Sequence, residues 1–206
     1  MNIDPPERGL FVTGTDTGVG KSVAAAWLAQ KWSAAYWKPV QSGLEEECDS
    51  DFVRRLSGAA VFPERFRLTH PLSPHEAARR DGVHIGLDDF LAPVAPCPLI
   101  VEGAGGVLAP LNDEARMVDL MARLGLPVVL VARTALGTIN HSLMSLECLR
   151  ARGLQVWGAI LSGPPDAVNR EAIARFGRVR ILAEIPRLEP LTRASLMAVP
   201  FCDEAP

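Results

Sequence analysis

The stretch Gly14-Thr15-Asp16-Thr17-Gly18-Val19-Gly20-Lys21-Ser22 decides the fold predicted for this chain. It follows the apolar residues 10–12 and leads into an alanine-rich segment, so it lies between an expected strand and an expected helix. A turn of small residues lets backbone N–H groups point at an anion, and the following helix adds its unpaired N-terminal donors. In such a phosphate-binding loop, Lys21 reaches the β- and γ-phosphates and the Ser22 hydroxyl is placed to coordinate Mg²⁺. Thr15 stands where the usual pattern has its first glycine, so the loop is a variant.

Apolar runs alternate with helical segments along the rest of the chain. The expected strands are residues 10–13, 38–40, 99–102, 128–132, 156–161 and 180–185. The expected helices are residues 21–33, 51–56, 74–78, 87–91, 118–124, 138–152 and 166–176. This alternation predicts an α/β fold with a doubly wound, mainly parallel sheet flanked by helices, in one domain over residues 1–206.

Composition excludes several classes of function. The formal net charge is −3 and aromatic residues make up 6%, which argues against a nucleic-acid partner. No apolar run approaches the ~18 residues of a membrane span, and the N-terminus lacks the shape of a signal peptide. The four cysteines are widely spaced, without a metal or disulfide pattern, which favours free thiols and a cytoplasmic location.

Charged residues directly follow two apolar runs, residues 34–37 and 99–101. Residues just past the ends of parallel strands converge at one edge of the sheet. Glu102 ends a buried apolar run, and a carboxylate there is a candidate Mg²⁺ ligand beside Ser22. Lys38 precedes Pro39, and a second lysine near the γ-phosphate could neutralise charge that develops during phosphoryl transfer.

A second carboxylate for the metal is expected at the start of the helix near residue 51. Asp51 is the first choice and Asp49 is its competitor. Aspartate also serves at helix starts as a cap alone, so the sequence leaves the choice open.

The segment Gly137-Thr138-Ile139-Asn140 opens another expected helix. The free N–H groups of a helix start could hold a carboxylate of the substrate. Ordinary capping by Thr138 explains the same residues equally well.

Six segments together resemble the dethiobiotin synthetase family, and the likeness spans roughly residues 10–188. They are the loop at residues 14–22, Trp37-Lys38-Pro39-Val40-Gln41-Ser42-Gly43, Ser73-Pro74-His75-Glu76-Ala77-Ala78, Val101-Glu102-Gly103-Ala104-Gly105-Gly106, Leu136-Gly137-Thr138-Ile139-Asn140-His141 and Glu184-Ile185-Pro186. The first and fourth segments occur widely in the P-loop NTPase class, whereas the second and fifth, in this order, are more specific.

The resemblance implies an ATP- and Mg²⁺-dependent ligase of biotin synthesis. CO₂ and one amine of 7,8-diaminononanoate form a carbamate, which attacks the γ-phosphate of ATP to give a carbamic–phosphoric anhydride. The second amine then closes the ring and releases phosphate, leaving dethiobiotin and ADP. The family is also homodimeric, with the diamine's carboxylate reaching the helix start at residues 137–140 across the interface.

The same resemblance assigns roles to individual positions. Lys21, Lys38, Thr17 and Ser42 would act at the reacting groups, and Ser22, Asp51 and Glu102 would hold Mg²⁺. Ser42, Gly137, Thr138, Ile139 and Asn140 would bind the diamine. The nucleotide would contact Gly18, Val19, Gly20, Lys21, Ser22, Val23, Asp51, Glu102, Gly103, Ala104, Gly105, Ser162, Pro186, Arg187 and Leu188.

One position departs from the family pattern. Ser162 stands where family members often carry an asparagine that reads the adenine ring. A serine lacks the paired donor and acceptor of that amide. We therefore expect weak discrimination between nucleotide bases, so that other nucleoside triphosphates also serve.

Two alternatives share the loop but differ in function. A nucleotide-switched ATPase of the partitioning type would act through a partner protein, and such proteins commonly carry a basic amphipathic helix that is not found here. An ATP-dependent amidotransferase of the same class would need a glutaminase domain, for which 206 residues leave no room. ADP release that requires both bicarbonate and the diamine separates the ligase from both.

Overall fold

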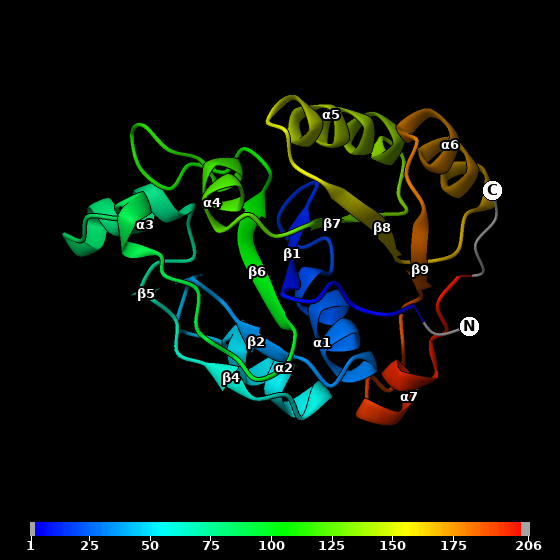
Figure 1. Ribbon diagram of the computed structural model, residues 1–206, viewed down its shortest axis with the longest axis horizontal. Helices are drawn as coiled ribbons and strands as arrows, with labels where there is room; N and C mark the ends of the chain where they lie inside the picture. Colours follow the sequence, from blue (N-terminus) through cyan, green and yellow to red (C-terminus); the bar gives the residue numbers. More distant parts are fainter. Residues whose placement is uncertain (1–2, 203–206) are drawn as a thin grey trace.

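The computed structural model describes residues 3–202 and is built around a seven-stranded sheet in which every paired strand is parallel (Figure 1). In spatial order the strands are β4 (Val61–Phe62), β2 (Ala35–Trp37), β6 (Leu99–Gly106), β1 (Gly9–Gly14), β7 (Val128–Arg133), β8 (Val156–Ser162) and β9 (Ile181–Ile185). The four strands β1, β6, β7 and β8 are largely apolar and buried, as parallel strands covered on both faces must be. The predicted doubly wound, mainly parallel sheet is therefore confirmed.

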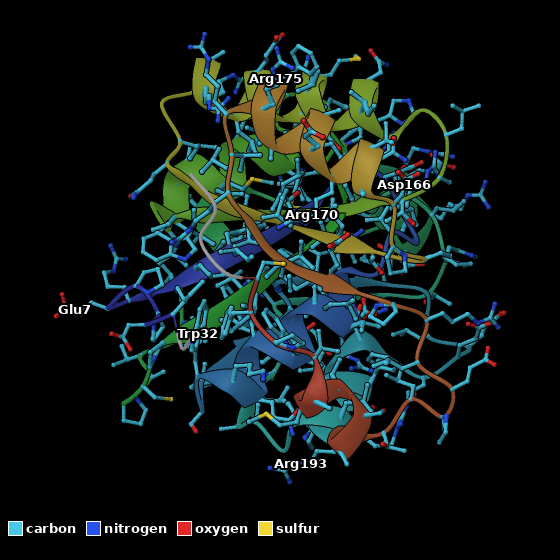
Figure 2. The ribbon with its side chains drawn as sticks, turned by 90° about the vertical axis from the view of Figure 1, so that its right-hand side faces the viewer. Glu7, Trp32, Asp166, Arg170, Arg175 and Arg193 are labelled. Atoms are coloured by element: carbon cyan, nitrogen blue, oxygen red, sulfur yellow. The ribbon has the colours of Figure 1, made fainter. Side chains whose placement is uncertain are left out.

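Helices cover both faces of this sheet. One face carries α4 (Met117–Leu124), α5 (Thr138–Ala151) and α6 (Ala167–Gly177), and the other carries α1 (Lys21–Lys31), α2 (Asp49–Ser57) and α7 (Arg193–Ala198). Figure 2 shows the two layers, with Arg170 of α6 on one side of the sheet and Arg193 of α7 on the other. The buried apolar residues accordingly form two clusters, one beneath each layer of helices.

Some boundaries differ from the sequence-based expectation. A strand was expected at residues 38–40, but Lys38-Pro39 interrupts the ladder there and separates two short strands, β2 and β3 (Val40–Ser42). β3 leaves the main sheet and pairs with β5 (Phe66–Leu68). The short helix expected at residues 87–91 is a single 3₁₀ turn, Leu87–Asp89, and α3 (Pro74–Asp81) begins at its proline as predicted.

The chain order places the ends of β1, β2 and β6 next to each other. β6 lies between β1 and β2, with Val12 opposite Glu102 and Trp37 opposite Val101. The phosphate-binding loop follows β1, Lys38 follows β2, and Glu102 lies within β6. Three segments far apart in sequence therefore meet at one edge of the sheet, where parallel α/β folds bind their ligands.

No helix within residues 3–202 has the length and apolar character needed to cross a bilayer.

Candidate active site

The loop between β1 and α1 has the backbone of an anion cradle. Gly18 and Gly20 adopt left-handed φ angles of 71° and 93°, which turn successive N–H groups to the inside of the loop. The Lys21 ammonium is buried and donates to the backbone carbonyl of Asp16 at 3.0 Å. Burial lowers the pKa of Lys21, and the nearby Lys38 lowers it further. The negative charge of a bound phosphate would favour the protonated form of Lys21.

Gly20 lies so close to Ser162 that no side chain fits. A Cβ on Gly20 would come within 2.4 Å of the Ser162 Oγ, whereas a Cβ on Gly18 would meet nothing within 4 Å. We expect Gly20→Ala to destabilise the fold by about 1–3 kcal/mol beyond the left-handed strain that both positions share. Urea unfolding measures the difference, with Gly18→Ala as the matched control.

Rescue by a second substitution tests the cause of that difference. Replacing Ser162 with glycine in the Gly20→Ala protein should restore most of the lost free energy of unfolding. If Gly18→Ala and Gly20→Ala are equally stable, the contact with Ser162 has no energetic consequence.

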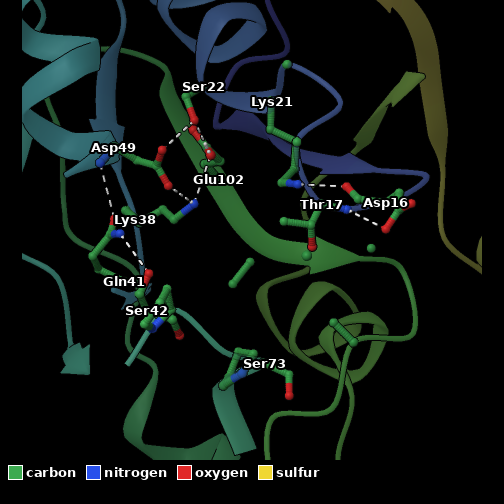
Figure 3. A pocket seen from close by; sticks show the side chains of 18 of the residues that line it. Asp16, Thr17, Lys21, Ser22, Lys38, Gln41, Ser42, Asp49, Ser73 and Glu102 are labelled. Carbon is green, nitrogen blue, oxygen red and sulfur yellow. Dashed lines mark hydrogen bonds and ion pairs between the residues drawn. The ribbon is translucent and has the colours of Figure 1, made fainter. Parts of the chain in front are cut away.

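Three oxygen atoms converge behind the loop (Figure 3). The Ser22 Oγ lies 2.7 Å from Asp49 Oδ1 and 2.9 Å from Glu102 Oε1. A serine hydroxyl has one proton, so it can donate to only one of these carboxylates at a time. Two carboxylate oxygens and a hydroxyl at such distances are ligands suited to a cation.

Lys38 supplies the positive charge of this cluster. Its buried ammonium lies 2.6 Å from Asp49 Oδ2 and 2.8 Å from Glu102 Oε1, and donates to the Gly103 carbonyl at 3.3 Å. Burial alone would lower the pKa of Lys38, but the carboxylates of Glu102 and Asp49 outweigh it and raise the pKa. Burial would likewise raise the pKa of Asp49, but Lys38 and the hydrogen bond from Ser22 lower it below its usual value.

The structure does not bring Asp51, the first choice for the second carboxylate, to this cluster. Helix α2 begins at Asp49, two residues earlier than expected, and its first turn directs Asp49 to Ser22 and Lys38. Asp51 is exposed and pairs with Arg54 on the same helix. The open alternative in the sequence, Asp49, is the residue that the fold brings to the cluster.

Two further residues support the cluster and were not among the predicted site residues. The Tyr36 hydroxyl, fully buried in β2, donates to Glu102 Oε2 at 2.9 Å, and the Gln41 Oε1 accepts from the Asp49 backbone N–H at 3.2 Å. Burial, followed by the Glu102 charge, raises the pKa of Tyr36 well above its usual value, so the phenol stays protonated as a donor. The general rule that a buried tyrosine finds a hydrogen-bond partner was the available signal, but it does not identify the partner.

A pocket of about 890 Å³ opens over this cluster. Predicted site residues that line it are Thr17, Gly18, Gly20, Lys21, Ser22, Val23, Lys38, Ser42, Glu102, Ala104 and Gly105. The start of α3, at Ser73 and Pro74, closes one side and was not predicted as part of the site. The other predicted residues, Val19, Asp51, Gly103, Ser162, 137–140 and 186–188, are not in its lining.

Ser162 nevertheless lies beside the loop, and the end of β9 pairs with it. Ser162 is opposite Ile185 in the β8–β9 ladder, the Gly163 N–H donates to the Ile185 carbonyl at 2.9 Å, and Gly20 contacts Ser162. Pro186 follows Ile185 directly. Ser162 is therefore next to the phosphate-binding loop, with Pro186 beyond the strand end that pairs with it, and contact of residues 162 and 186–188 with a base stays a prediction.

The start of α5 lies outside the pocket. The helix N-cap is Gly137 and no side chain caps it, so the capping by Thr138 that the sequence left open is not formed. The Thr138 hydroxyl instead donates to the Arg133 carbonyl, and Asn140 is exposed. A smaller pocket of about 400 Å³ lies between the α5 face and the loop, and its lining consists of Thr15, Asp16, 106–109, His141, Met144, Ser145 and Cys148. Within the described residues, one copy of the chain does not bring residues 137–140 to the Lys38 cluster.

The donor set fits magnesium held jointly with a nucleotide. Within residues 3–202, no three His, Cys, Asp or Glu side chains gather closely enough to hold a metal by themselves. Mg²⁺ in phosphate sites typically takes one or two carboxylates, with water and phosphate oxygens completing its shell. Asp49, Glu102 and Ser22 provide such a partial shell beside the phosphate-binding loop.

This fold and this loop define the class: the chain is a P-loop NTPase. An AAA domain family model matches residues 8–195. Solved structures with the same fold include a signal recognition particle receptor FtsY from Elizabethkingia anophelis, at TM-score 0.54 and 12% identity over 98% of this chain and 63% of that one. A ParA family ATPase from Chlorobium tepidum has a TM-score of 0.50 and 14% identity, and the match covers 93% of this chain and 90% of that one.

Sequence relatives narrow the class to one family. The ATP-dependent dethiobiotin synthetase BioD of Paramagnetospirillum magneticum is 53% identical, covering 94% of this chain and 95% of the relative. The protein of the same name from Nitrobacter hamburgensis is 51% identical, and the match covers 91% of this chain and 90% of the relative. The chain belongs to the dethiobiotin synthetase family, which confirms the resemblance seen in the sequence.

Proposed function

We propose that this protein carboxylates 7,8-diaminononanoate and closes the ureido ring of dethiobiotin at the expense of ATP. An amine of the diamine adds to CO₂ and loses a proton, giving a carbamate. A carbamate oxygen displaces ADP from the γ-phosphorus, and the second amine then displaces phosphate from the resulting anhydride. The observation that carries this proposal is the buried Lys38 ammonium, held between Asp49 and Glu102 directly beside the phosphate-binding loop, in a chain of this family.

Each pocket residue has a role that its position supports. The loop glycines and Lys21 would cradle the triphosphate, and Lys38 would face the carbamate and the γ-phosphate across the same pocket. Thr17 and Ser42 line the pocket on either side, where their hydroxyls would orient the reacting groups. The Ser42 Oγ is buried and has no hydrogen-bond partner within the described residues, so it is available to a ligand.

Magnesium would be held by Ser22, Asp49 and Glu102. Bound there, it would neutralise charge on the phosphate oxygens during transfer. Asp49 takes the place that the sequence gave to Asp51.

The diamine's carboxylate would lie at the start of α5 of a second copy of the chain. The N–H groups at this helix start, other than that of Thr138, which donates to the Ala135 carbonyl at 3.1 Å, suit an anion. The neighbouring surface is apolar and exposed at Leu136, Met144 and Leu108. Such a homodimer brings residues 137–140 to a pocket that they do not reach within one copy.

The test is the dependence of ADP release on both co-substrates. We expect ADP to form only when bicarbonate and diamine are both present, with one dethiobiotin per ADP. A rate of ADP release that is the same without the diamine would favour the nucleotide-switched ATPase instead. The likeness to the ParA family structure shows only the fold and does not favour that alternative.

Ser162 predicts weak discrimination between nucleotide bases. Because its single hydroxyl cannot match the paired donor and acceptor of an amide, we expect kcat/KM for GTP and CTP to lie within about ten-fold of that for ATP. Initial rates with the three nucleotides check this, and Ser162→Asn should increase the preference for ATP. A preference for ATP of several hundred-fold in the unaltered protein would contradict it.

A further inference from the structure

The Lys38 ammonium has no hydrogen-bonding capacity left over. It carries three N–H donors and faces three acceptors: Asp49 Oδ2, Glu102 Oε1 and the Gly103 carbonyl. Lys38 therefore cannot donate to a phosphate or a carbamate until it gives up at least one of these contacts. In this arrangement all three N–H donors of Lys38 are used, although Lys38 lines the pocket.

The oxygens that hold Lys38 are those that the proposed metal would need. Glu102 Oε1 lies within hydrogen-bond distance of both the Lys38 ammonium and the Ser22 hydroxyl. Asp49 faces Ser22 with Oδ1 and Lys38 with Oδ2. Two carboxylates match the charge of one divalent cation. A divalent cation and the ammonium together would exceed that charge at short range and repel each other.

Of the charged groups around this point, Lys38 has the longest and most flexible side chain. Glu102 is fully buried and its second oxygen accepts from the Tyr36 hydroxyl, and the backbone of Asp49 is held at the start of α2, where its N–H donates to Gln41. A lysine ammonium is carried on a flexible four-carbon stem. A cation entering the cluster would displace Lys38 and leave the carboxylates in place.

We infer that Lys38 is an exchangeable counter-ion of Asp49 and Glu102: its ammonium occupies the cation position in the nucleotide-free protein, and the divalent cation that enters with the nucleotide releases it toward the reacting groups. The inference rests on the proposed function, because it concerns the metal site assigned there. On this inference, metal binding would free the Lys38 ammonium from the two carboxylates, in addition to neutralising charge on the phosphate. Lys38 is then available only when metal and nucleotide are both bound.

Mn²⁺ binding to the nucleotide-free protein tests the exchange directly. We expect Lys38→Met to bind Mn²⁺ about ten-fold or more tightly than the unaltered protein, as measured by electron paramagnetic resonance of free Mn²⁺, because the competing ammonium is gone. The matched control is Lys31→Met on α1, whose ammonium donates to the Met197 carbonyl and touches no site residue; its Mn²⁺ affinity should not change. Equal or weaker Mn²⁺ binding by Lys38→Met would overturn the inference.

A second measurement needs no substitution and decides the question if Lys38→Met does not fold. The chain has three lysines, Lys21, Lys31 and Lys38, so protein labelled with ¹³C at lysine Cε gives three signals. We expect the Lys38 signal to shift when Mg²⁺ is added to the ADP complex, while the Lys31 signal stays constant. An unchanged Lys38 signal would reject the exchange.

The proposed metal site and the proposed exchange of Lys38 can be rejected separately. If Mn²⁺ binds the ADP complex and this binding is lost in Glu102→Gln, the metal site stands, and an unresponsive Lys38 rejects the exchange alone. If the ADP complex binds no Mn²⁺, the metal site itself is rejected and the exchange with it.

Discussion

Lys38→Gln is expected to lower turnover by about 10²-fold or more without weakening nucleotide binding. The ammonium lines the pocket but is not part of the loop that would hold the triphosphate, so its loss would remove a preorganised positive charge from the transfer step and spare binding. Single-turnover rates and ADP titration in the presence of Mg²⁺ separate the two quantities. The control is Lys31→Gln, which removes the same charge outside the site.

Two outcomes would count against this role for Lys38. Unchanged turnover would remove Lys38 from the mechanism. A loss of turnover fully explained by a matching loss of ADP affinity would make Lys38 a binding residue only.

Asp49→Asn is expected to raise the Mg²⁺ concentration needed for half-maximal activity by about 10- to 100-fold. The amide keeps the shape of the side chain but removes the charge that faces Ser22 and Lys38. Asp51→Asn is the matched control, two residues along the same helix, where an exposed carboxylate pairs only with Arg54. Its effect should stay within about two-fold, as for most surface substitutions.

Activity measured over a series of Mg²⁺ concentrations compares the two variants. A larger effect of Asp51→Asn than of Asp49→Asn would return the metal to the residue that the sequence favoured first, and would show that α2 begins differently in the working enzyme.

The sheet and most of its helices could be predicted because their signals are local. Runs such as Leu99–Val101 and Val128–Ala132 are continuous and apolar, and the loop at residues 14–22 fixes the first strand and helix around it. Lys38 and Glu102 could be placed together from strand ends alone, since the topology of a parallel sheet brings those ends to one edge.

The remaining features of the site and the fold depend on three-dimensional geometry that local sequence patterns do not determine. The choice between Asp49 and Asp51 turns on a helix start two residues away from the expected one, and such boundaries are the least determined feature of a sequence pattern. The Tyr36 contact with Glu102 joins residues 66 positions apart, and it depends on the register of β2 against β6. Strands β4 and β5 are two and three residues long in a proline-rich segment, too short to show a period.

The origin of the oxygen in the released phosphate tests the central claim most directly. The reaction is run as a single turnover with the diamine, ATP and C¹⁸O₂ in ordinary water, and is quenched before CO₂ exchanges its oxygen with the solvent. Attack of a carbamate oxygen on the γ-phosphorus predicts one ¹⁸O in each phosphate and one in each dethiobiotin formed. Phosphate that carries oxygen from water alone would mean that ATP is simply hydrolysed, and would contradict the account.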